Sequence, residues 1–484
     1  MRTLQKTKII FGILCILTIY VKAQTLNEKI EKVMQKHVDL DQFSGTVLLA
    51  KDGEVLYQKA FGEANKSYKV KNTLDTKFNI ASMGKMFTGV SIMQLEERGR
   101  LNINDPVITH LKDFPLGNKI TIYHLLSHTS GVGSYMRDLN YRSDRHRYKE
   151  IDDLLPIIYQ QKLQFKTPGE KFSYSNSGMI ILGAIIEKIT KQSYSNYISK
   201  NILEPTKMYD TAMKFGDEVV ENRALGYMKS ISGKYHNNSF NSSSPYPDGG
   251  ILSTVGDMLK FDQALYGSTL INEASKKKMF TALKVTYGLT FQVEDRQNNK
   301  VVGHSGGMPG FSSYFSRYLN DKYTIIALSN YDMISRNIVH YIEGILYNKE
   351  YPLPKERLRF FIYKNKAKIK TLNTFNDVIS YIKKNKYSLG HPQRLNTIAY
   401  EFMKEKEIVF AIKLFKMNVH LFSEDANVYD SLGEAYEKNK QYDLALENYK
   451  KAVEVAKKHS HRSLNSFNST LERFKKKQQS HKIL

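Results

Sequence analysis

The order of strand-like and helix-like segments constrains the fold of this chain most strongly. Two apolar, β-prone runs at 43–50 and 54–61 are separated by Lys51-Asp52-Gly53, and Asp-Gly between such runs is a strong hairpin signal. Helical patterns fill the middle, from about 100 to 260. Late segments follow: β-prone runs at 286–293, 312–318 and 323–329, and a closing helix at 334–347. Strands on both sides of a helical middle predict a sheet built from both ends of the domain beside an all-helical lobe.

The pair Ser82 and Lys85 is the strongest chemical signal in the chain. Apolar residues after Ser82 recur at helical spacing, at Met83, Met86, Phe87, Val90 and Met93. Residues three apart on a helix are neighbours, so the hydroxyl and the amine share one face. A serine needs an adjacent base to become a nucleophile, and a helix N-terminus favours negative charge developing there. Ser-x-x-Lys alone is common by chance, so a catalytic interpretation of the pair needs support from further motifs.

Two further motifs supply that context: Tyr-Ser-Asn at 174–176 and His-Ser-Gly-Gly at 304–307. With Ser82 and Lys85 they resemble the three motifs of the serine β-lactamase and penicillin-binding-protein superfamily. The branch they resemble contains class C β-lactamases, D-alanyl-D-alanine carboxypeptidases, D-aminopeptidases and related esterases. The resemblance covers roughly residues 27–348, in family order. Two flanking segments also match, at 125–131 and 249–254.

The resemblance implies an α+β fold and acyl transfer through a serine ester. The fold would be an antiparallel sheet flanked by helices plus an all-helical lobe, with the site in the cleft between them. Ser82 would attack a carbonyl, while Lys85 and Tyr174 would share the proton transfers, in an order that the sequence leaves open. Asn176 would hold the substrate amide, and the backbone N–H groups of Ser82 and Gly307 would stabilise the oxyanion.

The third motif departs from many β-lactamases, which carry Lys-Thr-Gly where this chain has His304-Ser305-Gly306. A histidine triplet occurs in family carboxypeptidases, D-aminopeptidases and esterases, which disfavours the β-lactamase interpretation. Protonated His304 could bind a substrate carboxylate, although imidazole is only conditionally charged near neutral pH. The resemblance implies neither a cofactor nor a metal.

Two rival motifs point to other chemistry. Gly-x-Ser-x-Gly at 303–307, followed by Asp332 and His340, fits an α/β-hydrolase elbow, but the residues after it read as loop and strand rather than helix. His124 and His128 have the spacing of metal ligands on a helix, but no glutamate follows the first histidine. We therefore expect structural hydrogen bonds rather than zinc at these histidines.

The N-terminus predicts a cleaved signal peptide over residues 1–23. Basic residues precede a short apolar run at 9–21, and Val21-Lys22-Ala23 resembles a cleavage site. The run is shorter than the ~20 residues of a spanning helix, so an uncleaved anchor is the less favoured alternative. The only cysteine, Cys15, lies within this segment. We therefore expect a periplasmic or secreted protein whose mature chain has no cysteine and so no thiol chemistry. The hydrolase domain is expected over residues 24–350.

The composition changes after about residue 350. Residues 351–391 read as a basic helical linker, 392–460 as tetratricopeptide-like repeats with a 34-residue period, and 461–484 as a basic tail. The repeats predict either a packing module or a groove for a protein or peptide partner. The formal net charge is +24, which allows weak association with an anionic membrane or cell wall. Nucleic acid is not an expected partner of an exported protein with these motifs.

These features together predict an exported serine hydrolase with an acyl-serine intermediate. The expected substrates are small D-amino-acid peptides, amides or esters. A β-lactamase is one alternative. The other is a non-catalytic scaffold whose degenerate hydrolase domain presents the repeats to a partner, which intact motif residues disfavour.

Overall fold

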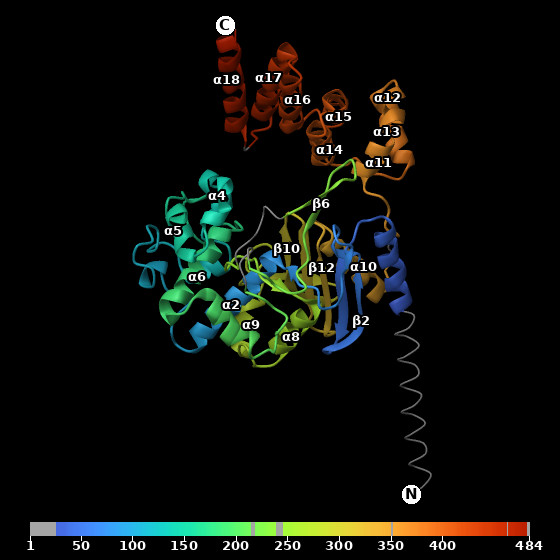
Figure 1. Ribbon diagram of the computed structural model, residues 1–484. Coiled ribbons are helices and arrows are strands. Elements are labelled where there is room, and N and C mark those ends of the chain that lie inside the picture. The colour runs from blue at the N-terminus through green and yellow to red at the C-terminus, as the bar shows by residue number, and fades with distance from the viewer. Residues whose placement is uncertain (1–25, 214–217, 239–244, 350–351, 462, 482–484) are drawn as a thin grey trace, which may run out of the picture. The chain divides into compact units, whose positions relative to one another are not determined.

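The computed structural model describes residues 26–481 except 214–217, 239–244, 350–351 and 462 (Figure 1). The expected signal peptide, with Cys15, lies outside these residues. The described residues form two compact units. The first runs up to Met228 and includes Asn237–Lys355, and the second consists of Lys229–His236 and the residues from Glu356 onward. No helix in the described part of the chain is long and apolar enough to cross a membrane.

A six-stranded sheet forms the centre of the first unit, with the order β2-β1-β12-β11-β10-β9 and antiparallel pairing throughout. Its strands are β1 (Gly45–Lys51), β2 (Glu54–Phe61), β9 (Gln292–Arg296), β10 (Asn299–Met308), β11 (Phe311–Tyr318) and β12 (Tyr323–Ser329). The early hairpin pairs with β12, which confirms the predicted sheet from both ends. Asp52 and Gly53 both have positive φ, at 50° and 85°, as a two-residue type I′ turn requires.

One predicted strand is misplaced. The run at 286–293 is irregular up to Phe291, and β9 begins only at Gln292. Thr290 has a φ of 60°, which breaks extended geometry there. A Cβ on Gly288 would lie 2.1 Å from the Met279 carbonyl oxygen, so this segment packs backbone against backbone instead of joining the sheet.

Helices α8 (Val255–Tyr266) and α10 (Ser335–Leu346) cover opposite faces of the sheet. Asp262 of α8 accepts hydrogen bonds from Arg317, whereas Ser335 of α10 bonds Ser312. Arg317 and Ser312 lie five positions apart on β11, and alternate residues of a strand face opposite sides. The antiparallel sheet therefore lies between helical layers, as predicted.

The middle of the first unit forms the predicted helical lobe. Its helices are α2 (Lys85–Glu97), α3 (Ile122–Leu126), α4 (Leu139–Ser143), α5 (Ile151–Tyr159), α6 (Asn176–Thr190) and α7 (Tyr194–Ile198). Figure 1 shows α4, α5 and α6 grouped beside the sheet. Helix α6 is apolar along most of its length and contacts α2, α3, α5 and α7, and a single hydrophobic core includes residues of both lobe and sheet.

The second unit is helical apart from its share of a small hairpin, β6 (Tyr227–Lys229) and β7 (Tyr235–Asn237), and has its own core. Its helices are α11 (Leu358–Lys364), α12 (Lys366–Thr371), α13 (Phe375–Lys384), α14 (Pro392–Lys404), α15 (Ile408–Leu421), α16 (Ala426–Lys438), α17 (Tyr442–Lys458) and α18 (Leu464–His481). Helix starts recur after 34 residues, from Pro392 to Ala426 and from Ile408 to Tyr442.

Two segments differ from their sequence description. The expected linker contributes Phe361, Ile369 and Val378 to the core of the second unit, and the expected tail contributes Phe467 and Phe474. Both segments are therefore structural parts of this unit, because their apolar residues recur at helical spacing within a basic background.

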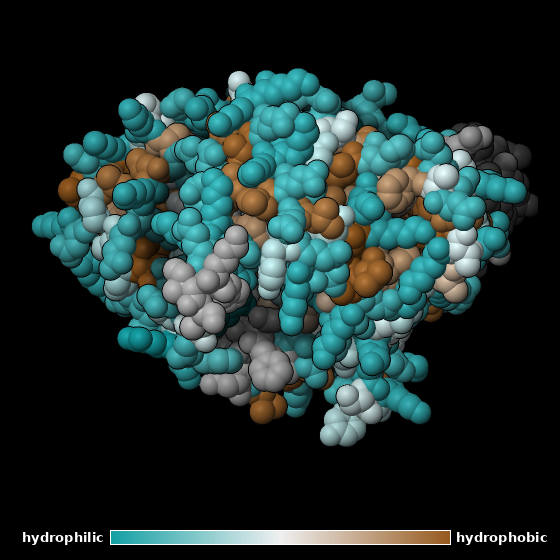
Figure 2. All heavy atoms as spheres, turned by 90° about the horizontal axis from the view of Figure 1, so that it is seen from above, coloured by the Kyte–Doolittle hydropathy of each residue, from teal (hydrophilic) through white to brown (hydrophobic). Residues whose placement is uncertain are grey.

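The face of the protein in Figure 2 is largely hydrophilic, with hydrophobic residues in small separate groups.

A buried ion pair links α8 to the sheet, and its loss should destabilise the first unit. The Arg317 and Asp262 side chains are each 1% exposed, and Thr324 Oγ1 donates to Asp262 at 2.7 Å. Asp262→Ala leaves an unpaired buried cation, so we expect a loss of about 3–5 kcal/mol in denaturant unfolding. Lys171→Ala breaks an exposed pair with Glu170 and should cost about 0–1 kcal/mol. Equal losses in the two variants would contradict this account.

Candidate active site

Ser82 and Lys85 meet as their spacing predicts. Ser82 lies in a 3-10 turn (Ala81–Gly84) that leads directly into α2, whose first residue is Lys85. Lys85 Nζ donates a hydrogen bond to Ser82 Oγ at 3.1 Å. The tighter first turn differs from the regular helix expected there, but it keeps the hydroxyl and the amine side by side.

The backbone around Ser82 is tightly constrained. Ala81 has a φ of 48°, which L-residues seldom adopt, and its N–H donates to Asn79 Oδ1 at 2.8 Å. A Cβ on Gly306 would lie 2.1 Å from the Ile80 carbonyl oxygen, so only glycine lets β10 approach this turn. Ser313 Oγ donates to the same carbonyl at 2.7 Å. The position of Ser82 is thus fixed by β10 and β11.

Lys85 is fully buried and has a second acceptor in Asp248. Its Nζ donates to the Asp248 carbonyl oxygen at 2.5 Å. The Asp248 carboxylate accepts from Tyr135 Oη at 3.0 Å. Burial raises the pKa of Asp248, while the Lys85 charge opposes the shift. Burial also raises the pKa of Tyr135 well above its usual value, so the phenol remains a donor. The sequence did not point to Asp248 or Tyr135, because neither stands at a recognisable spacing from Lys85.

Tyr174 and Asn176 lie at the start of α6. Lys85 Nζ is 5.0 Å from the centre of the Tyr174 ring, which is 40% exposed, so the second motif reaches the first. Ser175 caps α6 by accepting from the Gly178 N–H at 2.9 Å, and it donates to the Gly133 carbonyl at 2.6 Å. Asn176 Nδ2 contacts Met136 Sδ at 3.1 Å, and within the described residues its Oδ1 has no partner.

His304 is buried, and both of its ring nitrogens are engaged. Nδ1 lies 2.6 Å from the Ser305 carbonyl oxygen, to which it can only donate, so Nε2 accepts from Tyr287 Oη at 2.9 Å. Burial, followed by the charge of Lys85, lowers the pKa of His304 to about 3. The imidazole is therefore neutral near physiological pH. The protonated form considered from the sequence is not the form this site holds.

Gly307 lies on an open edge of β10. The pairing of β10 with β9 ends at Gly303, and a Cβ on Gly307 would meet no atom within 4 Å. Its backbone is therefore accessible, as an oxyanion or substrate contact requires. The same strand excludes the α/β-hydrolase elbow: Ser305 sits within β10, which continues to Met308 and returns as β11 without opening a helix.

The two histidines of the metal alternative serve as hydrogen-bond acceptors. His124 Nδ1 accepts from the Thr121 N–H at 3.2 Å, and His128 Nδ1 accepts from the Ser175 N–H at 3.3 Å. In the described part of the chain, no three or more His, Cys, Asp or Glu residues are grouped as metal ligands. Tyr287 and His128 also contact the site. No sequence signal indicates Tyr287 as a functional residue, and the spacing of His128 indicates only a metal ligand.

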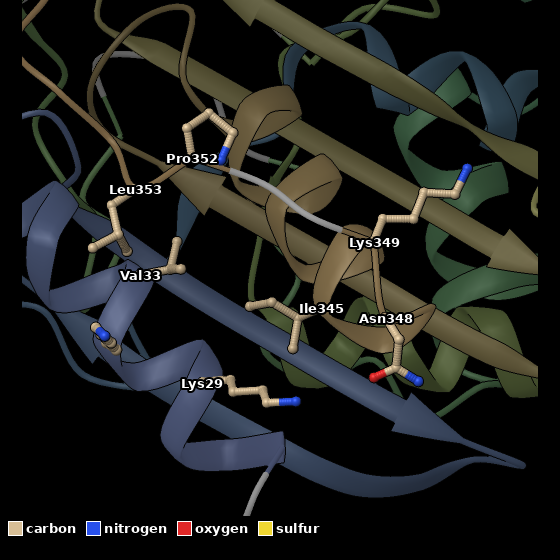
Figure 3. Close-up of a pocket in the computed structure, with 8 residues that line it drawn as sticks. Lys29, Val33, Ile345, Asn348, Lys349, Pro352 and Leu353 are labelled. Carbon is tan, nitrogen blue, oxygen red and sulfur yellow. The ribbon is translucent and has the colours of Figure 1, made fainter.

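A cavity of about 700 Å³ lies apart from these residues (Figure 3). It is lined by Lys29, Lys32, Val33, Ile345, Asn348, Lys349, Pro352 and Leu353. Figure 3 shows Lys29 and Val33 on a helix of residues 26–39, opposite Ile345 from the end of α10. None of the candidate catalytic residues lines this cavity.

The contact between Gly306 and Ile80 makes a direct prediction. Gly306→Ala places a methyl group against a backbone carbonyl that cannot move aside, so we expect about 1–3 kcal/mol of destabilisation. Gly307→Ala, one residue on, points into open space and should leave the melting temperature nearly unchanged. Thermal unfolding of both variants by circular dichroism tests this. A fully stable Gly306→Ala protein would show that β10 does not constrain the Ser82 turn.

Comparisons with known proteins identify the family of the first unit. The family model described as Beta-lactamase matches residues 30–336. Penicillin-binding protein 4* of Bacillus subtilis is 31% identical over 357 residues, covering 69% of this chain and 78% of its own length.

Solved structures show the same fold. A penicillin-binding protein from Bacillus halodurans superposes with a TM-score of 0.60 at 28% identity, over 65% of this chain and 98% of its own. A D-amino acid amidase from Ochrobactrum anthropi shares the fold, with a TM-score of 0.59 at 22% identity, over 67% of this chain and 99% of its own. Because the family model spans more than half of the chain, this protein belongs to the β-lactamase family of serine hydrolases, which also includes penicillin-binding proteins.

Proposed function

We propose that this protein hydrolyses small D-amino-acid peptides, amides or esters through an acyl-enzyme on Ser82. The hydrogen bond from the fully buried Lys85 to Ser82 Oγ, at 3.1 Å, carries the proposal. Serine becomes an effective nucleophile when an adjacent group accepts its proton. A buried amine with one hydroxyl and one carbonyl as partners is suited to that exchange.

The reaction would run in two balanced steps. Ser82 Oγ attacks the substrate carbonyl while its proton passes to the Lys85–Tyr174 pair, and that proton then leaves with the departing amine or alcohol. Water then attacks the ester, returning the proton to Ser82 as the acid is released. The partial exposure of Tyr174 and the closeness of its ring to Lys85 support a role for its hydroxyl in proton transfer to the leaving group. Backbone N–H groups of Ser82 and Gly307 would hold the oxyanion.

The third motif supports substrates that are neutral beside the scissile bond. His304 is held by Tyr287 and by the Ser305 carbonyl, so it presents no free donor and no charge to a carboxylate. We therefore assign His304 to shaping β10 rather than to binding an anion. Amides and esters suit such a site better than peptides ending in a free carboxylate. This property also disfavours the β-lactamase alternative, since penicillins carry a carboxylate.

We propose export to the periplasm or exterior, on the basis of the predicted signal peptide. We propose a tetratricopeptide-like second unit that binds a protein or peptide partner, supported by helix starts that recur after 34 residues and by Gly433, where a Cβ would lie 2.8 Å from the Tyr449 ring. Such small residues let paired helices approach closely.

Replacing the nucleophile tests the proposal directly. Ser82→Ala should abolish covalent labelling by a fluorophosphonate, read by intact-mass spectrometry, while costing about 1–3 kcal/mol of stability, because buried Lys85 keeps only its Asp248 acceptor. Ser305→Ala should keep the adduct. Labelling at Ser305 would revive the elbow alternative. A wild-type protein that is folded but forms no adduct and turns over no ester would favour the non-catalytic scaffold.

The neutral His304 predicts a specific pH behaviour. We compare kcat/KM for a D-amino-acid peptide with a free carboxylate and for its amide. Because the pKa of His304 is about 3, the imidazole gains no charge between about pH 5 and about pH 8, and the ratio of the two values should stay flat. His304→Lys should raise the ratio about tenfold by adding a charged donor. A wild-type ratio that falls as the pH rises through about 6.5 would show that His304 is protonated and binds the substrate carboxylate.

A further inference from the structure

His128 lies where the segment carrying Tyr174 is attached to the helical lobe. It follows α3, is fully buried, and has a φ of 54°. Its carbonyl oxygen accepts from the Ser173 N–H at 2.8 Å, and its Nδ1 accepts from the Ser175 N–H at 3.3 Å. One residue thus holds the backbone on both sides of Tyr174.

The ring of His128 also packs against the phenol ring of Tyr174. Its centre is 4.4 Å from that of Tyr174 and 5.0 Å from that of Tyr287, and Phe172 packs edge-on at 6.1 Å. Tyr287 in turn lies 6.4 Å from Tyr174, at an interplanar angle of 89°. Such ring pairs are directional contacts, so they restrict the orientation of the Tyr174 side chain.

The imidazole of His128 is neutral, and one of its nitrogens is unsatisfied. Burial, followed by the charge of Lys85, lowers its pKa well below the usual value. Because Nδ1 is an acceptor, the ring proton is on Nε2, which has no hydrogen-bond partner among the residues that the structure describes. An apolar ring of the same shape would avoid burying this unpaired N–H, so packing alone does not require an imidazole here.

We propose that His128 is a positioning residue for Tyr174: its Nδ1 fixes the backbone at Ser175, and its ring holds the phenol beside Lys85 for proton transfer. The inference rests on the proposed function, because it assigns a part of the same reaction. Lys85, His304, Tyr174 and Tyr287 are the titratable groups that surround the imidazole. His128 itself touches no reacting atom and acts only through Tyr174.

Two variants separate the two contributions. His128→Asn keeps an acceptor near the Nδ1 position and tolerates positive φ, but it removes the ring. His128→Phe keeps a ring and removes the acceptor. We expect each to lower kcat for a D-amino-acid amide at least about tenfold, with KM changed less than about threefold, because orientation rather than binding is lost. The pH–rate profile should also change shape, since Tyr174 takes part in proton transfer.

A double-mutant cycle separates positioning from general stability. Tyr174→Phe should lower kcat by about 100-fold, and adding His128→Asn to it should lower kcat little further, because the hydroxyl that His128 positions is already gone. The matched control is His124→Ala, which removes a helix-capping imidazole four residues earlier. It should reduce thermal stability while leaving kcat and the pH profile unchanged. Circular dichroism confirms that each variant is folded at the assay temperature.

The outcomes distinguish this inference from the proposed function. Additive effects in the cycle, or full kcat in either His128 variant, would overturn the positioning role. If one His128 variant fails to fold, the other variant tests the positioning role. It is then combined with Tyr174→Phe in its own double-mutant cycle. A wild-type protein not labelled at Ser82, or a fully active Tyr174→Phe, would instead refute the proposed function. If Ser82 is labelled and Tyr174→Phe lowers kcat, the proposed function stands. The His128 variants then test the positioning role alone.

Discussion

The burial of Lys85 is the constraint on which the rest of the first unit depends. A fully buried amine must find acceptors, because an unpaired buried cation is very costly. Its two acceptors are Ser82 Oγ, one helical turn away, and the Asp248 carbonyl, 163 residues later in the chain. Tyr135 from the helical lobe then holds the Asp248 carboxylate. One side chain thus joins the Ser82 turn, a distant loop and the lobe.

Ser82 is held in place by backbone geometry that other parts of the fold maintain. A left-handed residue such as Ala81 costs about 1–3 kcal/mol and persists only when its surroundings enforce it. Here Asn79 and Ser313 supply hydrogen bonds, and Gly306 allows β10 to approach the turn directly. The hydroxyl is therefore oriented before substrate arrives, which reduces the reorganisation that the reaction requires.

The electrostatics of the site follow from the same buried lysine. The charge of Lys85 contributes to lowering the pKa of both His128 and His304, in addition to the larger effect of burial. Both imidazoles are consequently neutral and work through hydrogen bonds and ring contacts. Tyr287 joins them, because its hydroxyl binds His304 and its ring packs on His128. A substrate beside β10 would therefore contact neutral rings and hydrogen-bonding dipoles, and neither histidine would add a positive charge to that of Lys85.

The sequence by itself determined the Ser82–Lys85 pair, the Asp52-Gly53 hairpin and the β-prone runs at both ends of the domain. Each depends on residues close together in the chain or on a hydrophobic period. Only the tertiary structure decided that His304 is neutral, that Asp248 supports Lys85, and that His128 and Tyr287 border Tyr174. It also placed 286–291 outside the sheet and packed the apparent linker and tail into a second core. These properties arise from burial and from contacts between distant segments, and neither leaves a regular spacing in the sequence.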